Sequence, residues 1–132
     1  MTGRLTTWNR WVAPDRRVIC TDERVLEFGG DAQAPWIDWR VTLRAPIDQP
    51  LLLGDNKDGT MALRVAQWMT APHLSGGVER GGTGQIVTSR GDTGHAAWGR
   101  RAEWCDDYAA HNGRTYGIAL FDHPGNLRHP TW

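Results

Sequence analysis

The sequence lacks an excess of charge of either sign, and it contains no long apolar run. Fifteen lysine and arginine residues balance fifteen acidic ones, and Lys57 is the only lysine. Zero net charge argues against nonspecific nucleic-acid binding, which needs a basic face. No apolar stretch approaches the roughly 20 residues that span a bilayer, and no segment has the pattern of a signal peptide. We therefore expect a soluble protein that binds neither nucleic acid nor membranes, and the pattern favours the cytoplasm while leaving the compartment open.

Cysteine is scarce, and motifs of covalent or cofactor-dependent catalysis are missing. Cys20 and Cys105 are the only two cysteines, too few for a disulfide framework. They favour two reduced core thiols, with a single bridge between strands as the alternative. The sequence has no Gly-x-Ser-x-Gly motif, phosphate-binding loop or dinucleotide fingerprint. We expect no cofactor.

Tryptophan is abundant by contrast, with eight residues in a chain of 132. Indole rings fill protein cores, and their flat faces also stack on the C–H faces of sugars. We expect two or three of the eight to form a sugar platform, although the sequence does not indicate which ones.

Short segments of alternating polar and apolar residues dominate the pattern. The clearest is 36–44, in which Trp39, Val41 and Leu43 point to one face and polar residues to the other. The segments that we predict as strands are 5–12, 17–28 with a bulge, 36–44, 61–69, 85–89, 104–108 and 116–121, with 51–53 as a short buried run.

Glycine and proline mark the connections between these strands. Residues 13–16 predict a hairpin turn, and residues 75–84, which include five glycines, predict a surface loop. Residues 64–70 also fit a helix, but the alternation around them favours a strand. We therefore predict an all-β fold, an antiparallel β-sandwich that forms one domain over residues 1–132 or part of a larger sandwich.

The segment 121–132 is the strongest candidate for a functional site. It follows an apolar run and holds two His-Pro pairs. Proline restricts the backbone of the residue before it, so we expect His123 and His129 to be held stiffly. Imidazole titrates near neutral pH, which makes both residues candidates for a catalytic acid or base.

Polar neighbours in the same segment complete this candidate site. We expect Asn126 and Arg128 to bind substrate, and Asp122 either to orient a histidine or to pair with Arg128. The alternative is a packed corner in which the histidines satisfy backbone groups. We expect no bound metal, because the spacing of these residues matches no zinc pattern.

Four further residues are candidates for substrate binding. Lys57 lies in a polar turn, Arg64 follows it, and Trp98 precedes Arg100 by two positions. An arginine can clamp a carboxylate bidentately, and a tryptophan with a nearby arginine can hold a sugar. The structural alternatives are a solvated turn for Lys57, a surface salt bridge for Arg64 and a cation–π contact for Trp98 and Arg100.

Four sequence runs together resemble a known family, DUF6807, which is often labelled the methane oxygenase PmoA family. The resemblance covers nearly the whole chain. The runs are 54–65 (GDNKDGTMALRV), 84–91 (GQIVTSRG), 98–106 (WGRRAEWCD) and 121–132 (FDHPGNLRHPTW). Two positions depart from the family pattern: Glu103 stands where proline is usual, and Gly125 where serine is common.

This resemblance implies a larger protein and a setting in sugar metabolism. Family members are about twice this length, so we expect the chain to be a central-to-C-terminal portion. The family resembles large β-sandwiches of the aldose-epimerase type and is frequent in bacteria that degrade polysaccharides. The lack of a membrane span argues against methane oxidation, because the methane monooxygenase subunit with that label is a membrane protein.

Two functional hypotheses follow. The first is a sugar-modifying enzyme that uses His123 or His129 for proton transfer and binds a small molecule or an oligosaccharide. The alternative is a noncatalytic carbohydrate-binding or structural module. Exposed strand edges also make a homodimer a possible assembly.

Overall fold

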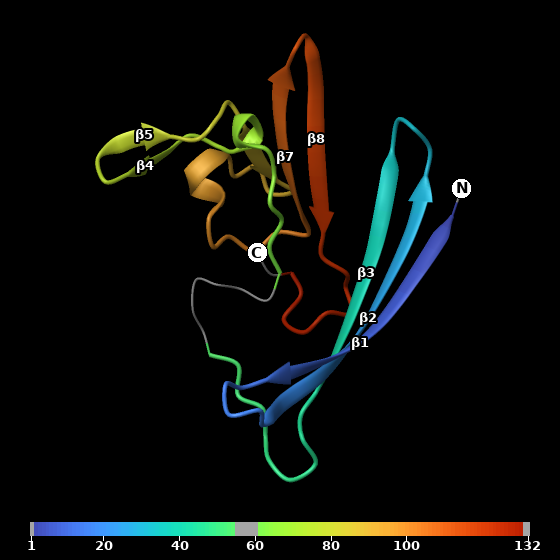
Figure 1. Ribbon diagram of the computed structural model, residues 1–132. Helices are drawn as coiled ribbons and strands as arrows, with labels where there is room; N and C mark the ends of the chain where they lie inside the picture. Colours follow the sequence, from blue (N-terminus) through green and yellow to red (C-terminus); the bar gives the residue numbers. More distant parts are fainter. Residues whose placement is uncertain (1, 55–60, 131–132) are drawn as a thin grey trace. The chain divides into compact units, whose positions relative to one another are not determined.

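Antiparallel strands dominate the chain in the computed structural model, which describes residues 2–54 and 61–130 (Figure 1). The strands are β1 (Gly3–Val12), β2 (Val18–Gly30), β3 (Pro35–Arg44), β4 (His73–Ser75), β5 (Val78–Arg80), β6 (Gln85–Thr88), β7 (Trp104–His111) and β8 (Arg114–Phe121). They form three antiparallel sheets, ordered β1-β2-β3, β4-β5 and β6-β7-β8. The helical elements in the described ranges are two short 3-10 turns, η1 (Gln67–Met69) and η2 (Gly94–Ala97). The predicted all-β class is confirmed, and the three sheets are consistent with a β-sandwich.

The chain divides into two compact units, Met1–Gly59 and Thr60–Trp132, and each is described by itself. The first unit is the three-stranded meander β1-β2-β3. The Arg16 amide donates to the Ala13 carbonyl at 2.8 Å, which closes the predicted hairpin turn. The register between β1 and β2 slips by one residue at this end, so that Ile19 is the extra residue of a bulge. Figure 1 shows the β1-β2 ribbon bending toward this turn.

A buried carboxylate lies between β1 and β2. Asp22 is 2% exposed and accepts hydrogen bonds from Asn9 Nδ2 at 2.7 Å and from Trp11 Nε1 at 2.6 Å. Arg24 donates to both carboxylate oxygens, each at 3.0 Å. The hydrogen-bonded guanidinium of Arg24, followed by the Trp11 and Asn9 donors, holds the pKa of Asp22 far below its usual range. A carboxylate satisfied by four donors fixes how these strands pair, so this network is structural.

The second unit is built on β6-β7-β8, with β7 in the centre. A tight connection at Asn112 and Gly113 joins β7 to β8, and both of its residues have positive φ. The apolar residues buried in this unit are small or flexible and come from η1, η2, β7 and the segment before β7; they are Met69, Ala97, Ala102 and Ala109. η1 also adds Trp68, which stacks on His111 with ring centroids 4.4 Å apart.

Three local predictions were wrong. Residues 61–66 form no strand pairing with the described part of the chain, and 67–69 form η1, because alternation becomes a strand only where a partner strand pairs with it. The predicted loop over 75–84 contains part of the β4-β5 hairpin, since Gly76 and Gly77 both adopt the positive φ that a two-residue turn requires. The leucines of 51–53 are not buried, and Leu52 is 89% exposed.

Candidate functional site

The segment after β8 forms a compact loop over residues 122–130. The pairing of Trp104 with Phe121 closes the β7-β8 ladder, and the Asp122 amide then donates to the Glu103 carbonyl at 2.9 Å. Within the loop, the Asn126 amide donates to the His123 carbonyl at 2.8 Å, and the His129 amide to the Asn126 carbonyl at 3.2 Å. These turn hydrogen bonds fold the loop back on itself and bring its polar side chains together.

Asp122 and His129 form the central pair of this loop. His129 Nδ1 lies 3.1 Å from Asp122 Oδ2, and Asn126 Nδ2 donates to Asp122 Oδ1 at 2.7 Å. Because a carboxylate can only accept, we assign the ring hydrogen of His129 to Nδ1, which leaves the Nε2 lone pair open. The His129 side chain keeps 21% exposure, so it remains accessible to a small molecule. The contact between Asp122 and His129 agrees with one of the two alternatives predicted for Asp122.

His123 presents the opposite arrangement. The Gly125 amide donates to His123 Nδ1 at 2.9 Å, so a neutral His123 ring carries its hydrogen on Nε2. Glycine at position 125 allows this close approach, since a Cβ there would lie 3.1 Å from His123 Nδ1. The loop thus holds one imidazole whose Nε2 can accept a proton and one whose Nε2–H can donate a hydrogen bond.

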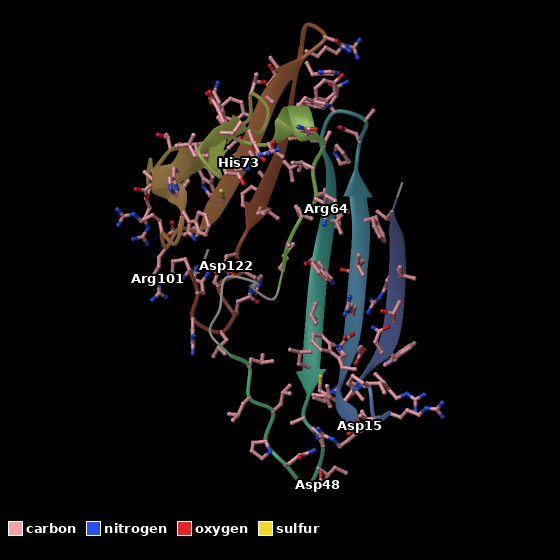
Figure 2. All side chains as sticks on the ribbon, turned by 60° about the vertical axis from the view of Figure 1, so that its left-hand side comes forward. Asp15, Asp48, Arg64, His73, Arg101 and Asp122 are labelled. Carbon is pink, nitrogen blue, oxygen red and sulfur yellow. The ribbon has the colours of Figure 1, made fainter. Side chains whose placement is uncertain are left out.

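Arg101, which lies outside the loop, donates hydrogen bonds to its backbone, whereas the residue predicted from the sequence for substrate binding was its neighbour Arg100. Arg101 Nη2 donates to the Arg128 carbonyl at 2.6 Å and to the His129 carbonyl at 3.3 Å, while Nε donates to the Pro130 carbonyl at 2.8 Å. Figure 2 shows Arg101 and Asp122 in the same part of the second unit. Arg128 adopts a φ of 65°, and the His129-Pro130 peptide bond is cis. The guanidinium therefore fixes three consecutive carbonyls next to the Asp122–His129 pair.

The other predicted binding residues are distributed differently. Trp98 directly follows η2 and is 75% exposed. Arg100 is exposed, and its Nε contacts the Ala96 carbonyl at 3.4 Å and Asp92 at 3.9 Å. Because three residues of extended chain span at most about 11 Å, Trp98 lies within that distance of Arg101. Trp98 and Arg100 are thus near the loop, but neither forms a contact with it in the structure.

Two predicted residues precede this region in the chain. Arg64 is exposed, lies in a segment without regular structure, and forms no hydrogen bond or ion pair with any described residue. Lys57 lies outside the described residues. The structure therefore gives Arg64 no hydrogen bond or ion pair with the loop over residues 122–130, which we call the histidine loop.

Metal and thiol chemistry have few candidates in the described ranges. Residues 2–54 and 61–130 contain no group of three or more His, Cys, Asp or Glu side chains that could hold a metal ion. Cys20 and Cys105 are both free thiols; Cys20 is buried and Cys105 is half-buried. Burial, with added repulsion from Asp107 and Asp106, raises the pKa of the Cys105 thiol and makes it a poor nucleophile. The helices of the described residues include none that is long and apolar enough to cross a membrane.

Comparison with known families agrees with the resemblance seen in the sequence. A family described as being of unknown function, DUF6807, matches residues 1–132. The chain belongs to the DUF6807 family. Neither a curated protein nor a solved structure matches it.

Glu103, one of the two positions at which this DUF6807 chain departs from the expected family pattern, forms several hydrogen bonds next to the loop. Glu103 accepts hydrogen bonds from Ser89 Oγ at 2.5 Å and from Arg90 Nη2 at 3.0 Å, and its own amide donates to Ser89 Oγ at 2.9 Å. The Ser89 and Arg90 hydrogen bonds lower the pKa of Glu103 to about 2. Since the Glu103 carbonyl also receives the Asp122 amide, this network anchors the start of the histidine loop.

Proposed function

We propose that this DUF6807 chain is carbohydrate-active and modifies a sugar by proton transfer at the histidine loop. The observation that carries the proposal is the Asp122–His129 pair at 3.1 Å, with His123 in the same loop as the complementary tautomer. A base and a hydrogen-bond donor on one loop can take a proton from one position of a sugar and return it to another.

His129 acts as the base in this mechanism. Asp122 holds its ring through Nδ1 and stabilises the imidazolium that forms when Nε2 takes a proton. His123 donates a hydrogen bond from Nε2 to a sugar oxygen and stabilises the negative charge that develops there, and the His129 imidazolium then returns its proton to the sugar. A positioned acid or base of this kind contributes a rate factor of about 10² to 10⁴.

Several neighbouring groups would bind the sugar. Trp98 would stack on a sugar ring, and Arg100 would hydrogen-bond hydroxyls at its edge. Asn126 and Arg128 extend from the loop itself, and Asn126 also supports the Asp122 carboxylate. Arg64 would supply a further hydroxyl or carboxylate contact, and the sugar-binding role of Lys57 stays a prediction from the sequence.

The experiment that tests this proposal follows proton exchange in sugars. A panel of aldoses, ketoses and uronic acids is incubated with the 132-residue chain in D2O, and ¹H NMR records loss of C–H signals and interconversion of anomers. We expect at least one sugar to react, and His129→Ala and His123→Ala to abolish the reaction while the melting temperature stays nearly unchanged.

The matched control is His73→Ala, because His73 lies exposed on the β4-β5 hairpin and its ring is hydrogen-bonded, among the described residues, to the nearby Ala71 carbonyl alone. This variant should react like the wild type. Turnover retained in both loop variants would contradict the proposed roles of the loop histidines.

A second candidate function is noncatalytic carbohydrate binding, which the 75% exposure of Trp98 favours. In that case sugars would quench tryptophan fluorescence through Trp98, and no product or isotope exchange would form. Binding that is lost in Trp98→Ala, together with the absence of exchange for every sugar, would support this candidate over the enzyme.

A further inference from the structure

We infer that the β1-β2-β3 sheet carries a binding site for an acidic oligosaccharide, in which Trp8 stacks on a sugar ring and Arg10 binds the carboxylate of a uronic acid. The site lies entirely within the first unit. It uses none of the residues of the histidine loop, so it can be tested independently of the proton transfer proposed there.

The sheet register brings the recognition groups together in two neighbouring rows. Trp8 lies opposite Glu23, and Arg10 lies opposite Thr21, which in turn lies opposite Arg44. Since alternate residues of a strand point to the same face, these five side chains share one face of the sheet. The bulge at Ile19 lies beyond both rows, so the register is continuous where the site is built.

A shallow hollow of about 420 Å³ lies over these rows and is lined by the same residues, together with Asn9 and Asp22. Volumes of about 300 to 1,000 Å³ are typical of small-molecule sites. The hollow is open, which suits a chain of sugars better than an enclosed small molecule.

Trp8 is the platform of this site. It is 74% exposed on a regular strand, where neighbouring positions carry polar side chains. An indole left in water offers a large flat apolar face, and stacking a sugar ring on it removes apolar surface from water on both sides. Adjacent polar groups then satisfy the ring hydroxyls, for which Thr21 and Glu23 are suitably placed.

The charges of the hollow select an acidic sugar. Glu23 pairs with Arg44 at 3.1 Å, so these two charges offset one another. The Asp22 carboxylate is satisfied by Arg24 and its other donors. No described carboxylate pairs with Arg10, which leaves one guanidinium free to bind a carboxylate bidentately beside the tryptophan.

The test compares trigalacturonic acid with its fully methyl-esterified form, which keeps the rings and removes the charge. Binding to the 132-residue chain is measured by tryptophan fluorescence and by calorimetry. We expect the acid to bind about tenfold more tightly than the ester, with an advantage that shrinks as salt is added. Measurements on the wild-type protein are enough to reject the site. Equal affinities for the acid and the ester, or no binding of either, would overturn the inference.

Variants then assign the two contacts. Arg10→Gln should reduce the affinity for the acid to that for the ester, and Trp8→Ala should abolish binding of both. The matched controls are Arg4→Gln and Trp36→Ala, since Arg4 is already paired with Glu27 at 3.2 Å and Trp36 lies outside the hollow. Wild-type affinity in Arg10→Gln and Trp8→Ala, or equal losses in the controls, would reject the site.

His129→Ala separates this inference from the proposed enzyme. It should bind trigalacturonic acid like the wild type even though it loses any proton transfer. Absence of exchange in the D2O experiment would therefore not contradict the binding site on the sheet. Absence of binding to trigalacturonic acid would likewise not contradict the proton transfer proposed for the histidine loop.

Discussion

Replacing Arg101 with methionine should loosen the histidine loop without unfolding the protein. The substitution removes donors at 2.6, 2.8 and 3.3 Å from three loop carbonyls while it keeps a side chain of similar length. Two of these hydrogen bonds are short, and a typical net contribution is about 0.5 to 1.5 kcal/mol each. Because Arg101 is exposed, solvent competes for the same groups, and we expect a loss of about 1 to 2 kcal/mol in the stability of the loop.

Hydrogen exchange measures this loss where it occurs. The amides of Gly125, Asn126 and His129 are hydrogen-bonded within the loop and should exchange about 5 to 30 times faster in Arg101→Met, since 1.4 kcal/mol corresponds to a factor of ten. Amides in the β7-β8 ladder should keep their wild-type rates.

Arg100→Met is the matched control for this experiment. Arg100 is adjacent and also exposed, but its contacts, at 3.4 Å and 3.9 Å, do not involve the loop. Equal loop exchange rates in the two variants would refute the conclusion that Arg101 fixes the loop.

Three further predictions concern single positions. Gly125→Ser places a Cβ 3.1 Å from His123 Nδ1, so the ring must move, and we expect shifted His123 NMR signals and at least about a tenfold loss of turnover. The lowered pKa of Glu103, about 2 against its ordinary 4.5, means that its stabilising contribution is complete above pH 4.5 and is lost as the pH falls toward 2. The melting temperature of Glu103→Gln should therefore depend less on pH in this range than that of the wild type, and identical pH profiles would contradict the assignment. Burial and the neighbouring Asp106 raise the pKa of Asp107, so its ionised form is disfavoured in the folded protein. Asp107→Asn should therefore raise the melting temperature at neutral pH by a few degrees. The difference should vanish in acid, where the protonated Asp107 of the wild type and the Asn of the variant are both neutral.

The sequence predicts the strands well where the local pattern and the pairing agree. Residues 36–44 alternate cleanly and form most of β3, and the turn at 13–16 has the proline and the polar residues that such a turn requires. Residues 61–66 alternate just as well but have no described partner strand, and pairing is a long-range property that a local pattern does not contain.

In the candidate site, too, the residues that act locally were predicted, and the residue that makes long-range contacts was not. His123, Asn126 and His129 were predicted from a short segment whose prolines and polar residues act locally, and Asp122 joins them within a few residues. Arg101 contacts residues 27 to 29 positions away, and its neighbour Arg100 has the same residue type, so the sequence could not decide between them.

The surface residues raise a similar difficulty. Eight tryptophans predicted a sugar platform without identifying it, because exposure depends on which face of each sheet is covered. The sequence proposed Trp98, which is 75% exposed, whereas Trp8, at 74% exposure, emerges only from the three-dimensional structure. Asp22 likewise gives no signal in the sequence, since its donors come from two paired strands.

The central claim, that the loop holds a proton-accepting imidazole and a hydrogen-bond-donating one in complementary tautomers, is tested most directly by the ring tautomers of its histidines. A long-range ¹H–¹⁵N NMR spectrum of the wild-type protein at about pH 8, well above the usual histidine pKa, identifies the protonated nitrogen of each ring. The account predicts hydrogen on Nδ1 of His129 and on Nε2 of His123, with the His129 preference lost in Asp122→Ala. Hydrogen on Nε2 of His129, or the same tautomer in both rings, would contradict it.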